Sequence, residues 1–419
     1  MTAHAADSHL SPVEELDRLI EAGRLPSAGL MDQALRHSAD EDGHLDATVV
    51  TALCRHLEES AQLIADHPLT QGGIDRTDAF RYLLSLTAFA VDWGILSGDP
   101  LAPMFSPAYP AHRLDWGAAN PDGVYRKVLV RDDCAYRIHG RIGNARYFSL
   151  DFRPSSHNET VTPADLNPDP EGRFEMYVGG RDQGLWWPMQ VGTHAIVTRE
   201  FFDNWAEARK AQLRIDRIDG PDRLAQGDES VRIASSFEVI GRWILEGGVR
   251  YWLEHSTEML KRAENAFLDE FRRGETKLPV VCPGAWHLAP DEALLIELPD
   301  PHATYWGLQI ASSLVHTLDY SKALTSFNNA QAHQDPDGTY RLVLAHEDPG
   351  VYNWLDTGGL QYGTLFLRCY EAMSPSAPRT TLAKFADLHQ VVHAQRLTIE
   401  ERRVQIGERR EGVARLLCD

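Results

Sequence analysis

Two strand-rich stretches on either side of a central helical stretch constrain the fold of this chain more than any other feature. From Gly123 onward, short runs rich in Tyr, Val and Ile alternate with turn residues, and the same pattern returns after Pro279. Runs of this length and composition are typical of β-strands separated by tight turns. Because each sheet must bury one face, two stretches of similar size predict two β-sandwich-like units, although no internal repeat is evident in the sequence.

Helical patterns account for the rest of the chain. Amphipathic stretches cover residues 46–65 and 77–95, and a further helix start lies at Ser11-Pro12, where a capping Ser precedes a Pro in the first turn. Helices are also expected over Phe201–Arg217, over Ser230–Phe271 with an interruption at Gly247-Gly248, and over Thr380–Leu417. We therefore expect an α+β protein with a helical N-terminal region (1–100), a first β-rich unit (101–228), a helical insert (229–278), a C-terminal β-sandwich module (279–372) and a C-terminal helix (373–419).

The charge balance limits the partners of the protein. The chain of 419 residues carries 61 acidic and 41 basic side chains, which gives a formal net charge of −20. An acidic surface repels phosphate groups, so we expect binding neither to nucleic acid nor to anionic membranes. The sequence does not fix the oligomeric state, and a homo-oligomer is compatible with it.

Cysteine usage and hydropathy predict a cytoplasmic protein. Five scattered cysteines, an odd number without a CxxC motif, fit a reducing compartment. Residues 1–10 have neither the basic nor the apolar region of a signal peptide. No stretch approaches the roughly 18 uninterrupted apolar residues of a membrane span, so we expect no membrane insertion.

Polar residues gather between residues 305 and 368, beside strand-like apolar runs. Buried polar side chains cost free energy unless they are hydrogen-bonded, so they collect where a shaped site or a locked turn is needed. The segments concerned are Tyr305-Trp306-Gly307, Ser326–Ala332, His346-Glu347-Asp348-Pro349-Gly350, Asn353-Trp354-Leu355-Asp356-Thr357 and the closing Arg368.

These segments resemble a bacterial module classified as domain of unknown function (DUF) 1214. The motifs that carry the resemblance are Tyr-Trp-Gly, Ser-x-Asn-x-x-Gln-Ala, His-x-Asp-Pro-Gly and Asn-Trp-Leu-Asp-Thr with a closing Arg, and Asn120-Pro121-Asp122 fits the upstream region. Asn329 departs from the pattern, which has Gly there. The resemblance covers about residues 105–372. It implies a jelly-roll-like β-sandwich, often paired with a second one, and no assigned reaction. Relatives occur near lipid, steroid or xenobiotic catabolism, which is association and not mechanism.

His346, Asn353 and Asp356 are the candidate catalytic residues. His346 with a carboxylate partner is a candidate general acid or base, and Asn353 is a candidate donor to a substrate oxygen. The competing interpretation is a structured corner, in which the turn Asp348-Pro349-Gly350 fixes the loop and Asp356 forms a buried ion pair with Arg368. The sequence leaves both interpretations open.

The sequence contains no established cofactor or nucleophile motif. It has no GxSxG, no GxxxxGK[ST] and no GxGxxG after a strand. His389 and His393 share a helix face but lack the glutamate of HExxH, and the remaining histidines are dispersed. We therefore expect no bound metal and no cofactor.

Aromatic residues are the remaining signal. Eight of the ten tryptophans are Trp186, Trp187, Trp205, Trp243, Trp252, Trp286, Trp306 and Trp354. Core packing explains such residues individually, but an aromatic-lined pocket between the sandwich and the Trp243–Trp252 helices would suit an apolar ring system.

We therefore expect an enzyme that acts on a hydrophobic small molecule bearing a hydroxyl or carbonyl group, of lipid, steroid or xenobiotic type, by acid/base chemistry. The alternative is a non-catalytic β-sandwich protein that binds a ligand or docks a partner. Besides the three catalytic candidates, the expected binding residues are Tyr305, Trp306, Asn328, Gln331, Trp354 and Arg368.

Overall fold

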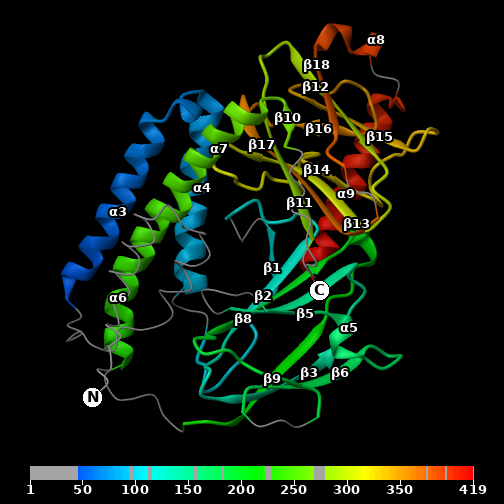
Figure 1. The fold of residues 1–419 in the computed structure, drawn as a ribbon. Helices are drawn as coiled ribbons and strands as arrows, with labels where there is room; N and C mark the ends of the chain where they lie inside the picture. Colours follow the sequence, from blue (N-terminus) through cyan, green and yellow to red (C-terminus); the bar gives the residue numbers. More distant parts are fainter. Residues whose placement is uncertain are drawn as a thin grey trace, which may run out of the picture.

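The computed structural model describes residues 46–94, 98–111, 116–153, 159–180, 184–221, 228–268, 279–373, 376–391 and 394–418. Within these ranges the chain is an α+β protein, with helices beside two β-sandwich units of two sheets each (Figure 1). The helix start expected at Ser11-Pro12 lies outside the described residues.

The first sandwich unit follows the strand-like runs after Gly123. One sheet has the order β1 (Tyr109–Pro110), β2 (Gly123–Leu129), β8 (Ala195–Phe201), β4 (Tyr147–Phe152) and β5 (Glu159–Val161). The other has the order β7 (Trp186–Trp187), β6 (Arg173–Val178), β3 (Ala135–Arg141) and β9 (Gln212–Asp219). Apolar side chains such as Phe148, Leu150 and Ile196 fill the space between the two sheets.

The second sandwich unit lies beyond the central helices. One sheet has the order β10 (Ala266–Phe267), β11 (Val280–His287), β17 (Tyr362–Ala372), β13 (Ala303–Ser312) and β14 (Ser326–Asn328). The other has the order β16 (Trp354–Asp356), β15 (Thr339–Ala345), β12 (Glu292–Pro299) and β18 (Arg379–Lys384). Its core contains Trp306, Leu308 and Leu367.

The second unit repeats the first, strand for strand. Adding nine to each strand number of the first unit gives the order of both sheets in the second, including the parallel pairs β6–β7 and β15–β16. The registers place Tyr147-Phe148-Ser149 opposite β8 as Tyr305-Trp306-Gly307 lies opposite β17. In both units a Trp of the parallel strand donates to a backbone carbonyl, Trp186 Nε1 to Gly179 at 3.1 Å and Trp354 Nε1 to Ala345 at 3.2 Å. The chain therefore contains an internal structural duplication.

Helices form a bundle along one side of the sandwiches (Figure 1). Its members are α3 (Ala47–Asp66), α4 (Gly73–Gly94), α6 (Asp228–Arg242), the segment η4 (Trp243–Arg250) and α7 (Tyr251–Ala263). The expected helix start at 46 is confirmed, since the Asp46 carboxylate accepts the Thr48 amide at 2.8 Å. The side chains of α4 that point inward, such as Tyr82 and Leu86, belong to the same core as Trp243.

The interruption expected at Gly247-Gly248 does not break the helix. Residues Trp243–Arg250 continue it as a π-helix, a wider form often associated with functional sites. The two glycine carbonyls accept hydrogen bonds from aromatic side chains, from Trp116 Nε1 at 3.4 Å and from the Tyr82 hydroxyl at 3.0 Å. A Cβ on Gly248 would lie 2.3 Å from Leu86, so glycine permits close helix packing here.

Strands occupy part of two other expected helices, although the second of these keeps the expected C-terminal helix. Phe201–Arg217 contains only the short η3 (Trp205–Glu207), after which β9 forms a sheet edge beside β3. Thr380–Leu417 begins with β18, which pairs with β12, and continues through η5 (Phe385–Asp387), α8 (Leu388–Val391) and α9 (Ile399–Cys418). In both cases pairing with a distant strand overrides the local helical pattern.

The units meet through their five-stranded sheets. Ring contacts cross the boundary, with centroid distances of 4.8 Å for Tyr147–Tyr370 and 5.7 Å for Phe201–Tyr305. Helix α9 spans both units, running from the second unit toward the first, where the C-terminus lies (Figure 1). Its Arg415 donates to the Ala206 carbonyl of the first unit at 3.3 Å.

Candidate functional site

Polar and aromatic side chains line the boundary between the two five-stranded sheets. We call them the inter-unit layer, and they are Tyr125, Tyr147, Arg199, Phe201, Tyr305, Gln309, Arg368 and Tyr370. They point away from the two sandwich cores because strand residues alternate between faces. Three of the six predicted binding residues lie in or against this layer: Tyr305, Asn328 and Arg368.

Asp122 is the buried polar centre beside the inter-unit layer. Only 2% of this residue is exposed, and its carboxylate accepts three hydrogen bonds from distant segments. The donors are the Tyr305 hydroxyl at 2.6 Å, Trp205 Nε1 at 2.7 Å and Asn328 Nδ2 at 2.8 Å. Burial raises the pKa of Asp122 to about 6, against the effect of these hydrogen bonds and of the nearby Arg409.

The contacts of Asp122 explain why Tyr and Gly occur together in the Tyr-Trp-Gly motif. The Tyr305 side chain lies along its own strand over Gly307, two residues further on. A Cβ on Gly307 would lie 2.3 Å from the Tyr305 hydroxyl. Asn120 Nδ2 donates to the same hydroxyl at 2.7 Å, so the hydroxyl both donates and accepts. Glycine at 307 therefore lets Tyr305 reach Asp122.

Arg368 does not form the expected ion pair with Asp356. Its guanidinium donates to Gln309 Oε1 and to the Ala118 carbonyl, and it lies over the Phe366 ring at 5.3 Å. Asp356 accepts the Gly358 amide at 2.9 Å instead. The prediction is wrong because β16 and β17 belong to opposite sheets of the sandwich, and Arg368 points out of it. Burial lowers the pKa of Arg368.

Arg199 occupies the equivalent position in the first unit. It lies opposite Ser149 as Arg368 lies opposite Gly307, and it pairs with Asp151 where Arg368 binds Gln309. Sequence reasoning did not single out Arg199 or Asp151, and it quoted Asp122 only as part of the Asn120-Pro121-Asp122 segment. The signal that identifies the first two is the structural repeat, which becomes visible only through the strand registers.

The candidate catalytic residues lie apart from the inter-unit layer, in a corner of the second unit. The His346 ring contacts Thr357 Oγ1 at 2.8 Å and the Leu288 carbonyl at 3.4 Å, so a neutral imidazole protonated at Nε2 satisfies both. The Asn353 amide accepts the His333 N–H at 2.8 Å and donates to backbone carbonyls of His333 and Arg341 at 2.8 and 3.0 Å. Burial raises the pKa of Asp356. These contacts are those of a structured corner.

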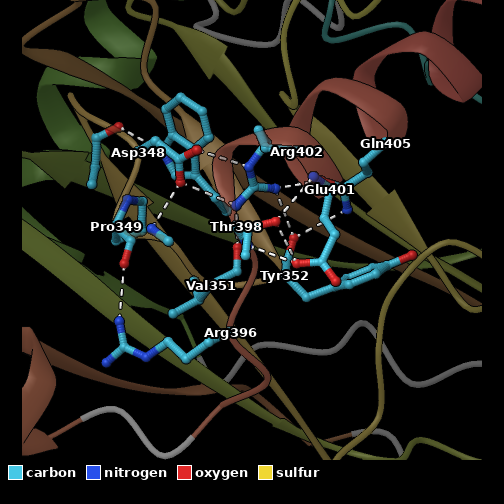
Figure 2. A network of polar contacts seen from close by, with 12 residues as sticks. Asp348, Pro349, Val351, Tyr352, Arg396, Thr398, Glu401, Arg402 and Gln405 are labelled. Carbon is cyan, nitrogen blue, oxygen red and sulfur yellow. Dashed lines mark hydrogen bonds and ion pairs between the residues drawn. The ribbon is translucent and has the colours of Figure 1, made fainter.

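Asp348 of the His-x-Asp-Pro-Gly motif binds helix α9 (Figure 2). Arg402 donates to both carboxylate oxygens of Asp348, at 2.9 and 3.1 Å, and to the carbonyls of Val351 and Tyr352. Arg402 is 5% exposed and lies over the Trp354 ring at 5.3 Å. The motif and the predicted binding residue Trp354 therefore hold the C-terminal helix.

The last two predicted binding residues also have packing partners. Trp306 is buried in the second sandwich core, edge-on to Tyr340 at 4.7 Å. The Gln331 Oε1 accepts from Arg409 of α9 at 3.5 Å. Arg409 also donates to Ser326 and to the Tyr320 carbonyl, and lies over Trp205 at 4.7 Å.

An aromatic surface continues from Arg368 toward the helices. Phe366, beneath the Arg368 guanidinium, belongs to a cluster against which Trp252 of α7 packs. Trp252 is edge-on to Trp116 at 6.0 Å, and Gly117 lets the two segments approach, since a Cβ there would lie 3.3 Å from Trp252. Trp116 and Trp252 are both partly exposed. The aromatic region expected beside the Trp243–Trp252 helices thus adjoins the inter-unit layer.

Two findings bear on metals and membranes. Within the described residues, no group of three or more His, Cys, Asp or Glu side chains is arranged to hold a metal ion. Every described helix is too short or too polar to cross a bilayer.

One of two similar solved structures supports the fold, the one from Burkholderia cenocepacia. An uncharacterized protein from Burkholderia cenocepacia matches 81% of this chain and 98% of its own, with a TM-score of 0.72 and 26% identity. The VPA0106 protein from Vibrio parahaemolyticus matches 78% of this chain and 100% of its own at 10% identity, with a TM-score of 0.45. No family model and no curated protein matches the chain.

Proposed function

We propose that this protein binds a hydrophobic small molecule through an anionic or carbonyl oxygen at Arg368. The observation that carries the proposal is the environment of the guanidinium. Its acceptors, Gln309 Oε1 and the Ala118 carbonyl, are both neutral, and no described carboxylate forms an ion pair with it. A partly buried charge without a carboxylate in direct contact is costly, and an anionic ligand group would compensate it.

The aromatic surface beside Arg368 suits the apolar body of such a ligand. Phe366, Trp252 and Trp116 follow one another from the guanidinium toward the helices. Partly exposed tryptophans next to one polar anchor are the usual composition of a small-molecule site. Lipid, steroid and xenobiotic acids share this combination of an apolar body and an oxygen-bearing head.

The contacts favour binding over the acid/base enzyme. Both ring nitrogens of His346 and the whole amide of Asn353 are engaged in local hydrogen bonds. The Asp122–Tyr305 pair, the other candidate for proton transfer, is likewise engaged in hydrogen bonds within the protein. A group that moves a proton to a substrate needs direct or water-mediated contact with it.

The test is a titration of the full-length protein with 2-naphthoate, followed by the fluorescence of the ligand. We expect saturable binding by the parent and at least about tenfold weaker binding by Arg368→Gln, because a charge-assisted hydrogen bond is lost. Arg173→Gln, at a 66% exposed surface arginine, is the matched control and keeps the parent affinity. Equal affinity of Arg368→Gln and parent refutes the proposal.

A further inference from the structure

Tyr147 and Tyr305 occupy equivalent positions in the two units, but their hydroxyls differ in hydrogen bonding. In the second unit, the Tyr305 hydroxyl is held by Asp122 and Asn120. In the first unit, the Tyr147 hydroxyl is buried and has no hydrogen-bond partner within the part of the chain that the structure describes. The neighbouring Ser149 hydroxyl is in the same state, and the two residues are 1% and 0% exposed.

Position 149 explains the difference. Its equivalent in the second unit is Gly307, whose missing Cβ leaves room for Tyr305 to fold back over its strand. Ser149 carries a side chain there and adds a second hydroxyl beside the first. Two buried hydroxyls without partners are costly and rare in native proteins, and they call for a specific explanation.

Arg199 completes the group. It lies directly opposite Ser149 in the strand register and donates to Asp151, and its side chain is 24% exposed. The Asp151 carboxylate also accepts the Thr160 hydroxyl at 3.0 Å. The Arg199–Asp151 pair has no net charge, in contrast to Arg368, which has only neutral acceptors. Burial raises the pKa of Tyr147, and the neighbouring Ser149 hydroxyl and then Arg199 act against it.

We propose that Tyr147, Ser149 and Arg199 form a second binding site, in the first unit, for a neutral hydroxyl or carbonyl group of a small molecule. Two hydroxyls that donate and accept, beside a charge-balanced arginine, match an alcohol, a phenol or a ketone better than an anion. The Tyr370 ring, edge-on to Tyr147 at 4.8 Å and partly exposed, provides an apolar wall. The proposed site lies on the first unit's side of the inter-unit layer, and Arg368 lies on the second unit's side.

The test uses 2-naphthol, which has the apolar body of 2-naphthoate and a neutral head. The full-length parent protein is expected to bind it saturably. Ser149→Ala and Tyr147→Phe are expected to bind at least tenfold more weakly. Both variants keep their fold, because each change removes a buried hydroxyl that has no partner. Melting temperatures at or above that of the parent will show this.

Arg173→Gln, at the exposed surface arginine used above, is the matched control and is expected to bind 2-naphthol as the parent does. If Arg368→Gln weakens 2-naphthol binding as strongly as Tyr147→Phe does, the two sites are one and the proposal of a second site is wrong. Absence of saturable 2-naphthol binding by the parent overturns it, as does unchanged affinity in both hydroxyl variants.

Discussion

Asp122 is the residue on which segments from both units converge. Its carboxylate binds Tyr305 and Asn328 of the second unit and Trp205 of the first, although the three lie far apart in the sequence. An Asn side chain cannot replace Asp122 in this position, because its amide N–H groups would face donors where an acceptor is needed. We therefore regard Asp122 as the polar joint between the units.

The titration of Asp122 gives a prediction for the pH dependence of stability. The pKa of Asp122 is about 6 in the folded protein and 3.8 in the unfolded chain. Between pH 3.8 and pH 6, Asp122 therefore takes up a proton when the protein folds. The stability that Asp122 contributes is therefore fully present below pH 3.8 and is lost as pH rises through 6, a change of about 3 kcal/mol. The Asp122→Asn variant has no titrating group at this position. The unfolding free energy of the parent minus that of the variant is therefore expected to fall as the pH rises from 4 to 7. A difference that stays constant over this range would contradict the prediction.

His346 gives a second prediction at this scale. We expect His346→Gln to lower the unfolding free energy by about 1 kcal/mol, since it disturbs the contacts with Thr357 and the Leu288 carbonyl. Affinity for 2-naphthoate per folded molecule is expected to stay at the parent value. Denaturant unfolding and the same titration measure the two quantities. Unchanged stability with loss of a catalytic activity would restore the acid/base assignment.

Among the elements, helix α9 owes its position to arginines that the sequence did not reveal as important. Arg402 binds the turn at Asp348 (Figure 2), and Arg409 binds β14 and Trp205. These contacts explain why the His-x-Asp-Pro-Gly motif, which reads as a catalytic candidate, holds a helix. They also connect a terminal element to both sandwich units.

Asp348→Asn tests the role of this ion pair. We expect it to destabilise the protein by about 1.5 kcal/mol, because Arg402 loses a charge-assisted hydrogen bond to a partner that is 35% exposed and keeps its backbone acceptors. Amide hydrogen exchange in α9 is expected to accelerate before that of the sheets. Arg403→Gln, at the adjacent exposed pair with Glu400, is the control and leaves stability within about 0.5 kcal/mol. Slow exchange of α9 in Asp348→Asn would show that other contacts hold the helix.

The elements also show how far the sequence could predict the fold. The helix beginning after Asp46 followed from local residue chemistry, which acts within a few positions. Strands β9 and β18 did not, because each is formed by pairing with a strand more than sixty residues away. The π-helix at Gly247-Gly248 is contacted by Trp116 and Tyr82, which lie 131 and 166 residues away in the sequence.

For the whole molecule, the duplication is the organising feature. Two units with one topology face each other through equivalent sheets, and the equivalent arginines 199 and 368 lie between them. The sequence hid this repeat because the matching segments, Tyr-Phe-Ser and Tyr-Trp-Gly, share little beyond their first residue. Of the predicted site, Tyr305, Asn328 and Arg368 lie in or against the inter-unit layer, whereas His346, Asn353 and Asp356 lie in a separate corner of the second unit.

The most direct test of the central claim is a crystal structure of the protein with 2-naphthoate. The account predicts the ligand carboxylate at hydrogen-bond distance from the Arg368 guanidinium, with the naphthyl ring against Phe366 and Trp252. A ligand found only at other positions, with Arg368 still bound to Gln309 and the Ala118 carbonyl alone, would contradict it.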